Sequence, residues 1–441
     1  MMTKNDTRSG ELNVEAETSP TQRGQDRHRP FDALRVHNFR IYVAANLAGT
    51  TATWVQRIAQ DWLVLELTGS AFAVGITVAL QFFPMLVFGL YGGVLADRFD
   101  KRRLLILAQS AQMVLSAALG LLVLFDLLMP IHIYVAACML GFATVIDMPV
   151  RLAFIGEIVG KQHMANALTL NSATVQVGAL LGPAVGSALL ASVGGGPAFL
   201  CNALACLLAV AGILSMRTRE LNPTPPSAHG SGQLLEALRF ALGRPDMLLP
   251  LVLVVVAALF AVNTAIVYSA MAATVYDVGA GGYGLFQSLT AAGALGGAYL
   301  AMHRRTLRLR TVVFSALLYG AALLLAGMLP WYGAFAASLV LVGIGNILFI
   351  TATNALLQSL APPAFRGRIV SIFILALLGS QTIGGPLVGG MTELLGAAAT
   401  LVVMGAVMLI SATVTALLIA VRGNFGVRFS RSGMTVVAPG E

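Results

Sequence analysis

The chain has 441 residues, of which 57% are hydrophobic and only 10% are charged, and its mean hydropathy is +0.83. A water-soluble globular domain cannot bury that much apolar surface, so this class of protein is excluded. The formal net charge of +8 comes from basic residues scattered through short segments. The sequence lacks the cluster of basic residues interleaved with aromatic ones that is typical of nucleic-acid-binding surfaces, so no nucleic-acid partner is expected.

Membrane-spanning helices need roughly 20 apolar residues each, because the hydrocarbon of a bilayer is about 30 Å thick. We therefore expect an all-α membrane protein with twelve transmembrane helices. The predicted spans are 39–66, 72–96, 103–127, 131–155, 163–192, 197–216, 247–275, 281–302, 311–328, 331–357, 368–393 and 397–421.

The basic residues indicate the orientation of these spans, since Lys and Arg concentrate in short loops on the cytoplasmic side. With the N-terminus inside, all but two of the 27 Lys and Arg residues fall in predicted cytoplasmic segments. The exceptions, Arg57 and Arg151, lie within predicted spans. This pattern predicts a multi-pass protein of the inner (plasma) membrane with both termini in the cytoplasm.

The chain divides into five parts in this prediction. Two six-helix halves are separated by a linker rich in Pro and Gly that carries an amphipathic helix. The parts are a disordered cytoplasmic tail at 1–38, the first half at 39–216, the linker at 217–246, the second half at 247–421 and a cytoplasmic tail at 422–441.

An internal repeat supports the division into halves, because two separate motifs recur 203 residues later. The pairs are Gly182 and Gly385, Pro183 and Pro386, Gly186 and Gly389, Gly93 and Gly296, Lys101 and Arg304, and Arg102 and Arg305. Parallel repeats of this kind are typical of carriers whose halves rock about a site at the midplane of the membrane.

The segment from Gly93 to Arg103 resembles the loop between the second and third helices of the major facilitator superfamily, except that Asp100 occupies a usual glycine position. Other segments resemble the enterobactin-exporter-like branch, a group of drug and siderophore exporters; they begin at Asn38, Trp62, Gln81, Ala167, Gly182 and Arg366. The resemblance implies a major facilitator fold and a gating role for the loop. The implied gating residues are Gly93, Asp97, Arg98, Lys101, Arg102 and Arg103.

A glycine motif in the fifth predicted span resembles the antiporter motif of the superfamily, which implies export. Small residues at helical spacing also allow two helices to pack closely, and this alternative explains the motif equally well. The motif and its counterpart in the second half comprise Gly178, Gly182, Pro183, Gly186, Gly385, Pro386 and Gly389.

Two pairs of charged residues lie within predicted spans, where charges are costly and usually serve a function. Arg57 and Asp61 are four residues apart, as are Asp147 and Arg151, so each pair shares a helix face. We interpret the two acids as candidates for proton coupling, with the arginines as partners that release them when helices move. The alternative is a permanent salt bridge that stiffens the helix.

The polar residues Gln81, Asn171 and Asn263 are our candidates for substrate binding, although single polar residues in helix bundles often serve only as hydrogen bonds between helices. No metal site, cofactor or catalytic arrangement is expected, so the chain is not predicted to be an enzyme. The three cysteines fall within spans and resemble small buried residues.

These observations predict a monomeric secondary transporter in contact with membrane lipid. It would export small amphipathic molecules, such as drugs or siderophore-like metabolites, in exchange for protons. An importer or lipid translocator of the same fold remains an alternative, as does a membrane sensor or scaffold that transports nothing.

Overall fold

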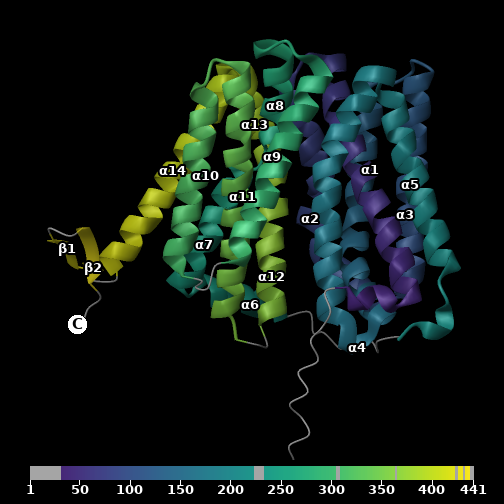
Figure 1. Cartoon of the computed structure of the whole chain (residues 1–441), viewed down its shortest axis with the longest axis horizontal. Helices are drawn as coiled ribbons and strands as arrows, with labels where there is room; N and C mark the ends of the chain where they lie inside the picture. Colours follow the sequence, from purple (N-terminus) through teal and green to yellow (C-terminus); the bar gives the residue numbers. More distant parts are fainter. Residues whose placement is uncertain are drawn as a thin grey trace, which may run out of the picture.

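The computed structural model is a bundle of long helices that run roughly alongside one another (Figure 1). It describes residues 31–222, 233–303, 308–362, 365–422, 426–430 and 433–437. Two groups of helices lie next to each other in the view, α1–α5 and α6–α14. The prediction of an all-α membrane protein is confirmed for the body of the chain.

The first group contains five helices, and the long α4 counts as two arms. They are α1 (His37–Thr68), α2 (Ala71–Arg98), α3 (Lys101–Leu124), α4 (Pro130–Val193) and α5 (Gly195–Ser215). Gly160 divides α4, because its φ of 66° lies in the left-handed region that glycine adopts readily. We call residues 130–160 and 162–193 the first and second arms of α4.

The second group begins with the short helix α6. Its helices are α6 (Gln233–Leu242), α7 (Pro245–Val256), α8 (Thr264–Ala270), α9 (Gly279–Met302), α10 (Leu309–Met328), α11 (Tyr332–Leu360), α12 (Arg366–Ile374), α13 (Gln381–Leu395) and α14 (Ala397–Arg422). π-Helical turns at Ala257–Ala261, Met271–Val275 and Leu375–Gly379 continue α7, α8 and α12. Two strands follow α14 and pair antiparallel, β1 (Gly426–Ser430) and β2 (Gly433–Val437).

Ten helical segments in the described part of the chain are long and apolar enough to cross a membrane. They include both arms of α4, the continuous segment 245–275 and the continuous segment 366–395. α1 and α9, with 32 and 24 residues, are also long enough but fall outside these ten. α1 carries Arg57, Asp61 and Glu66 within its length, which lowers its mean hydropathy.

The short helix α6 is attached to the second group through a stack of side chains. The Phe240 and Phe365 rings stack with centroids 5.4 Å apart, and the Arg368 guanidinium lies 5.0 Å from the Phe365 centroid. Arg368 also approaches Glu236 at 3.7 Å. The helix predicted in the linker is therefore present, and it packs on α12.

The two groups of helices meet where glycines remove side-chain bulk. A Cβ on Gly284 of α9 would overlap Ser187 of α4, and a Cβ on Gly389 of α13 would lie 2.6 Å from the carbonyl oxygen of Ala71 in α2. Gly75 of α2 similarly faces the backbone of α13. Backbones can approach this closely only at residues without a side chain.

These contacts lie toward one end of the bundle. We call the end where α1 runs into α2 the α1–α2 end, and the opposite end, where α2 runs into α3, the α2–α3 end. Among the glycines that the structure describes, the close contacts between the groups lie near the α1–α2 end, apart from the packing of Leu86 against Gly379 further along α2. This structure is therefore closed between the groups at the α1–α2 end.

Replacing Gly284 by Val should force the groups apart at the α1–α2 end, because the new side chain has no room beside Ser187. Overpacking costs about 1–3 kcal/mol, which corresponds to a shift of about 5- to 150-fold away from the closed population. Electron-spin distance measurements between labels on the exposed positions Leu67 and Leu394 would report the shift.

Gly281→Val is the matched control, since nothing lies within 4 Å of a Cβ on Gly281 of the same helix. If both variants leave the distance distribution as in the parent protein, the α4–α9 contact does not control closure.

Candidate functional site

The loop between α2 and α3 begins α3 with a side-chain cap. Asp100 Oδ1 accepts a hydrogen bond of 2.8 Å from the Arg103 backbone N–H, which satisfies one free donor in the first turn of α3. Aspartate is among the preferred residues at this position, which gives a physical reason for Asp100 in place of the expected glycine.

Two basic residues of this loop bind other helices of the first group. Lys101 Nζ lies 2.8 Å from Glu157 Oε1 of α4, and both side chains are only 11% exposed. Arg102 donates from Nε to the carbonyl of Ile213 at 3.1 Å and from Nη2 to that of Leu214 at 2.9 Å, at the last turn of α5. The loop thus connects α3 to α4 and to the carbonyl end of α5, where a cation is favoured.

The structure describes some of the predicted gating residues more fully than others. Arg98 ends α2 and is exposed. Gly93 and Asp97 lie in the last turns of α2, and the Asp97 side chain is outside the described residues. Glu157 was not predicted from the sequence, and its backbone carbonyl also accepts a hydrogen bond of 2.8 Å from the Asn222 backbone N–H.

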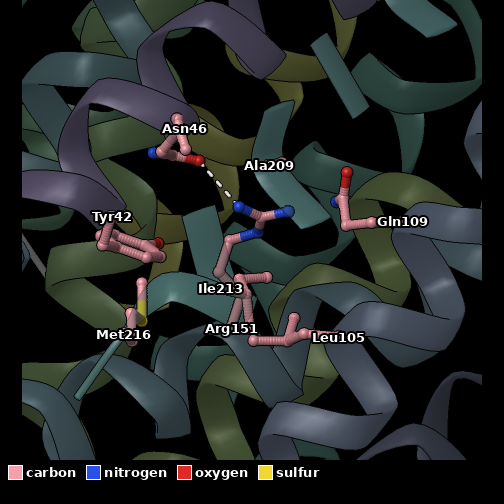
Figure 2. A pocket seen from close by; sticks show the side chains of 9 residues that line it. Tyr42, Asn46, Leu105, Gln109, Arg151, Ala209, Ile213 and Met216 are labelled. Atoms are coloured by element: carbon pink, nitrogen blue, oxygen red, sulfur yellow. Dashed lines mark hydrogen bonds between the residues drawn. The ribbon is translucent and has the colours of Figure 1, made fainter. Parts of the chain in front are cut away.

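Asp147 and Arg151, both on the first arm of α4, form an ion pair with two hydrogen bonds. Arg151 donates from Nε to Asp147 Oδ2 and from Nη2 to Asp147 Oδ1, each at 2.8 Å. Its third donor, Nη1, reaches Asn46 Oδ1 of α1 at 2.9 Å, and Gln109 of α3 donates to Asp147 at 3.0 Å. Figure 2 shows Arg151 pointing toward Asn46 in a pocket between these helices.

Asn171 continues this network into the second arm of α4. Its Oδ1 accepts a hydrogen bond of 2.9 Å from the Tyr42 hydroxyl and one of 3.1 Å from Asn46 Nδ2. The side chain that was predicted to bind substrate therefore joins α1 to α4, and its carbonyl oxygen already has two donors.

Arg57 and Asp61 are not joined by an ion pair among the described residues, although they are one helical turn apart. Arg57 Nη2 donates to Gln81 Oε1 of α2 at 3.2 Å. The Arg57 guanidinium lies 5.5 Å from the Trp54 ring centroid and 5.4 Å from that of Phe82. Each such cation–π contact is worth about 0.5–2 kcal/mol, less than the cost of burying a charge in a membrane.

Asp61 instead contacts the second group of helices. Its Oδ2 accepts a hydrogen bond of 2.9 Å from the hydroxyl of Tyr283 in α9, and Gln287 donates to the same hydroxyl at 3.3 Å. Asp61 is 2% exposed and Tyr283 is fully buried. Tyr283 was missed because the sequence contains no charge that would mark it as a partner for Asp61.

A second carboxylate crosses between the groups at the α1–α2 end. Glu393 of α13 accepts hydrogen bonds from the Ser70 hydroxyl and from the Phe72 backbone N–H, where α2 begins. The first turn of a helix offers free N–H groups and favours a negative charge, so this contact attaches α13 to α2.

Asn263, the third substrate candidate, directly precedes α8, after the π-helical turn that continues α7. Its Nδ2 donates to the carbonyl of Ala258 at 2.8 Å, and its Oδ1 is buried without a hydrogen-bond partner in the described part of the chain. An amide oxygen in this state can accept a hydrogen bond from a water or a ligand.

The glycine motif of the fifth predicted span packs the second arm of α4 against α1. A Cβ on Gly178 would lie 2.7 Å from Thr50, one on Gly182 would overlap Trp54, and one on Gly186 would lie 3.0 Å from Val55. Pro183 continues the motif, and its carbonyl faces Gly284 of α9.

The counterpart in α13 has a different neighbour. Gly385 and Gly389 pack against the backbone of α2, across the boundary between the groups, and Pro386 also contacts Gly75 there. The described residues contain no cluster of three or more His, Cys, Asp or Glu side chains that could hold a metal ion.

A family comparison identifies the chain. Residues 28–424 match the model of the transmembrane secretion effectors, a family within the major facilitator superfamily. The chain belongs to this family. The members are transporters of small molecules rather than enzymes. Like them, this transporter is a multi-pass membrane protein, as the composition predicted.

Two relatives transport siderophores according to their names. The transporter is 27% identical to the enterobactin exporter EntS of Shigella flexneri over 376 residues, which cover 82% of this chain and 85% of that one. It is also 27% identical to the staphyloferrin A transporter of Staphylococcus aureus, over 158 residues that cover 36% of this chain and 40% of that one.

Solved structures share the fold of this transporter. A bacterial homologue of the human lysosomal transporter Spinster, in an inward-facing and unoccupied conformation, superposes with a TM-score of 0.71 at 15% identity. The match covers 87% of this chain and 96% of that one. The nucleoside transporter NupG gives a TM-score of 0.68 at 10% identity, with 87% and 99% of the two chains covered.

Asp147→Asn should destabilise this transporter by on the order of 3 kcal/mol, because it leaves the Arg151 guanidinium partly buried without its carboxylate. The double variant Asp147→Asn with Arg151→Gln should recover part of that loss, since no charge is then left unpaired. Unfolding midpoints in detergent would measure both effects.

The exposed pair Arg217 and Glu220 provides the control, and Arg217→Gln should change stability by less than about 1 kcal/mol. Equal losses for Asp147→Asn and Arg217→Gln would contradict a structural role for the α4 pair.

Proposed function

We propose that this transporter exports a small siderophore-like molecule across the inner membrane by alternating access, driven by a proton gradient. The observation that carries the proposal is the family match over residues 28–424, together with the siderophore transporters among the relatives. The close contacts between the helix groups at the α1–α2 end support the alternating-access step, because such a step must break them.

The proposal includes twelve spans arranged as two six-helix repeats. α1 and α9 supply the two spans beyond the ten strongly apolar segments, and both are longer than the roughly 20 residues that a bilayer requires. The 203-residue repeat of the glycine–proline motif supports the two halves. The proposed domain boundaries are those expected from the sequence.

The orientation follows from the basic residues in this proposal. The α2–α3 end carries Arg98, Lys101, Arg102 and Arg103, so it is placed in the cytoplasm, with both termini. The closed α1–α2 end is then external in this proposal. The gating role of the loop remains part of the proposal.

In this mechanism Asp61 and Asp147 are the candidates for the proton-carrying group. The Asp61–Tyr283 hydrogen bond crosses between the halves, so it must break when the external end opens. The Asp147–Arg151 pair lies within the first half, where motion of α1 would change the contact with Asn46. Asp61 is therefore the better placed of the two to sense the conformational change.

Inverted membrane vesicles that contain the transporter should accumulate its substrate when the pH gradient makes their interior acidic, because vesicle uptake then corresponds to cellular export. Comparison of spent medium from cells with and without the protein would first identify the substrate. Accumulation in right-side-out vesicles only would identify an importer and contradict the proposal.

Asp61→Asn should retain substrate exchange but lose at least about tenfold of the accumulation driven by a pH gradient. Asparagine can still accept the Tyr283 hydrogen bond, but it cannot titrate. Purified protein in liposomes would be assayed for exchange without a gradient and for accumulation with one, and Asp147→Asn would be assayed alongside. Full accumulation by both single variants and by the double variant would show that coupling lies elsewhere.

A further inference from the structure

Most of the hydrogen-bond donors of the Arg57 guanidinium have no partner among the described residues. Of its five N–H groups, one donates to Gln81 in the described part of the chain. By comparison, all three nitrogens of the Arg151 guanidinium donate hydrogen bonds, two to Asp147 and one to Asn46. Arg57 is half-buried in α1. A cation inside a membrane protein usually faces a partner or a cavity, and no carboxylate among the described residues pairs with Arg57.

Arg57 lies about one helical turn from a contact between the two groups of helices. Asp61 touches Tyr283 of the second group, and residues four apart share a helix face. Arg57 lies on the α2–α3 side of that contact, and its own side-chain contacts in the described part of the chain are with Trp54 of α1 and with Gln81 and Phe82 of α2.

The groups around Arg57 limit what can bind there. Trp54 and Phe82 place two aromatic rings about equally far from the guanidinium, and the Gln81 side chain holds it from α2. Asp61 is the acidic group nearest along α1, while α9 presents the neutral Tyr283 and Gln287. A planar anion can take two parallel N–H bonds from a guanidinium, and a ring attached to it can pack on aromatic faces.

We propose that Trp54, Arg57, Gln81 and Phe82 form a binding site for an aromatic carboxylate or a similar planar aromatic anion. Arg57 binds the anionic group, the two rings pack against the aromatic part, and Gln81 positions the guanidinium. The assignment of this site to the transported substrate rests on the proposed function, but anion binding itself does not. Arg57 then serves as a ligand-binding residue, not as the ion-pair partner of Asp61.

Binding of 2-naphthoate to the full-length protein in nanodiscs of neutral lipid would test the site, with no anionic headgroup present to compete. The parent protein should bind 2-naphthoate at least about tenfold more tightly than the neutral isostere 2-naphthamide. Arg57→Gln should weaken 2-naphthoate binding by about 10- to 100-fold, as expected for loss of a charged hydrogen bond, and Arg57→Lys should be intermediate.

Phe82→Leu should also weaken binding, because it removes a ring beside Arg57. Phe83→Leu is the matched control and should leave the affinity unchanged, since Phe83 is 42% exposed and makes no cation–π contact with Arg57 among the described residues. Unfolding midpoints would establish that each variant is folded. If Arg57→Gln does not fold, the folded Arg57→Lys variant still tests the site.

Three results would overturn the site: no 2-naphthoate binding by the parent protein, equal affinity for acid and amide, or unchanged affinity in folded Arg57 variants. Failure of the site and failure of the function remain distinguishable. If inverted vesicles accumulate the substrate but the Arg57 variants bind 2-naphthoate as tightly as the parent protein, the site alone is refuted. Arg57-dependent binding by a protein that does not export would refute the proposed function alone.

Discussion

Polar groups inside this bundle must find their partners within the protein, because the hydrocarbon of a membrane offers none. This constraint accounts for the arrangement of the first helix group. Asp147 and Arg151 satisfy each other and extend through Asn46 to Asn171, so that α1, α3 and both arms of α4 share one hydrogen-bond network. Where the constraint is met less completely, at Arg57, the structure leaves capacity for a ligand.

The two arginine–aspartate pairs show how far sequence spacing can predict contacts. Both pairs are four residues apart on a helix, yet only Asp147 and Arg151 form an ion pair among the described residues. Spacing along one helix shows which side chains can meet, but packing against other helices decides which do. Tyr283 draws Asp61 toward α9, and Gln81 holds Arg57 toward α2, and neither partner could be identified from α1 alone.

The fold was more accessible to prediction than the site. Span positions follow from runs of apolar residues, and even the break in α4 falls between two predicted spans, at Gly160. The glycine motifs were recognised as packing elements, but their neighbours were not. Gly182 packs on α1 within one group, whereas Gly385 packs on α2 across the boundary, although the two residues occupy equivalent places in the repeat. Glu157 and Glu393 were missed because their partners are distant in sequence.

The attachments at the two sides of the linker set an upper bound on how far the helix groups can separate. Asn222 is held to α4 through the Glu157 carbonyl, and α6 is held to α12 through the Phe240–Phe365 stack. From Asn222 to Gln233, where α6 begins, the chain takes eleven residue steps, and at about 3.5 Å per step these reach at most about 39 Å. A swing of the groups that needs a longer reach would have to detach one anchor first, so an insertion between the anchors should increase the separation that the groups can reach.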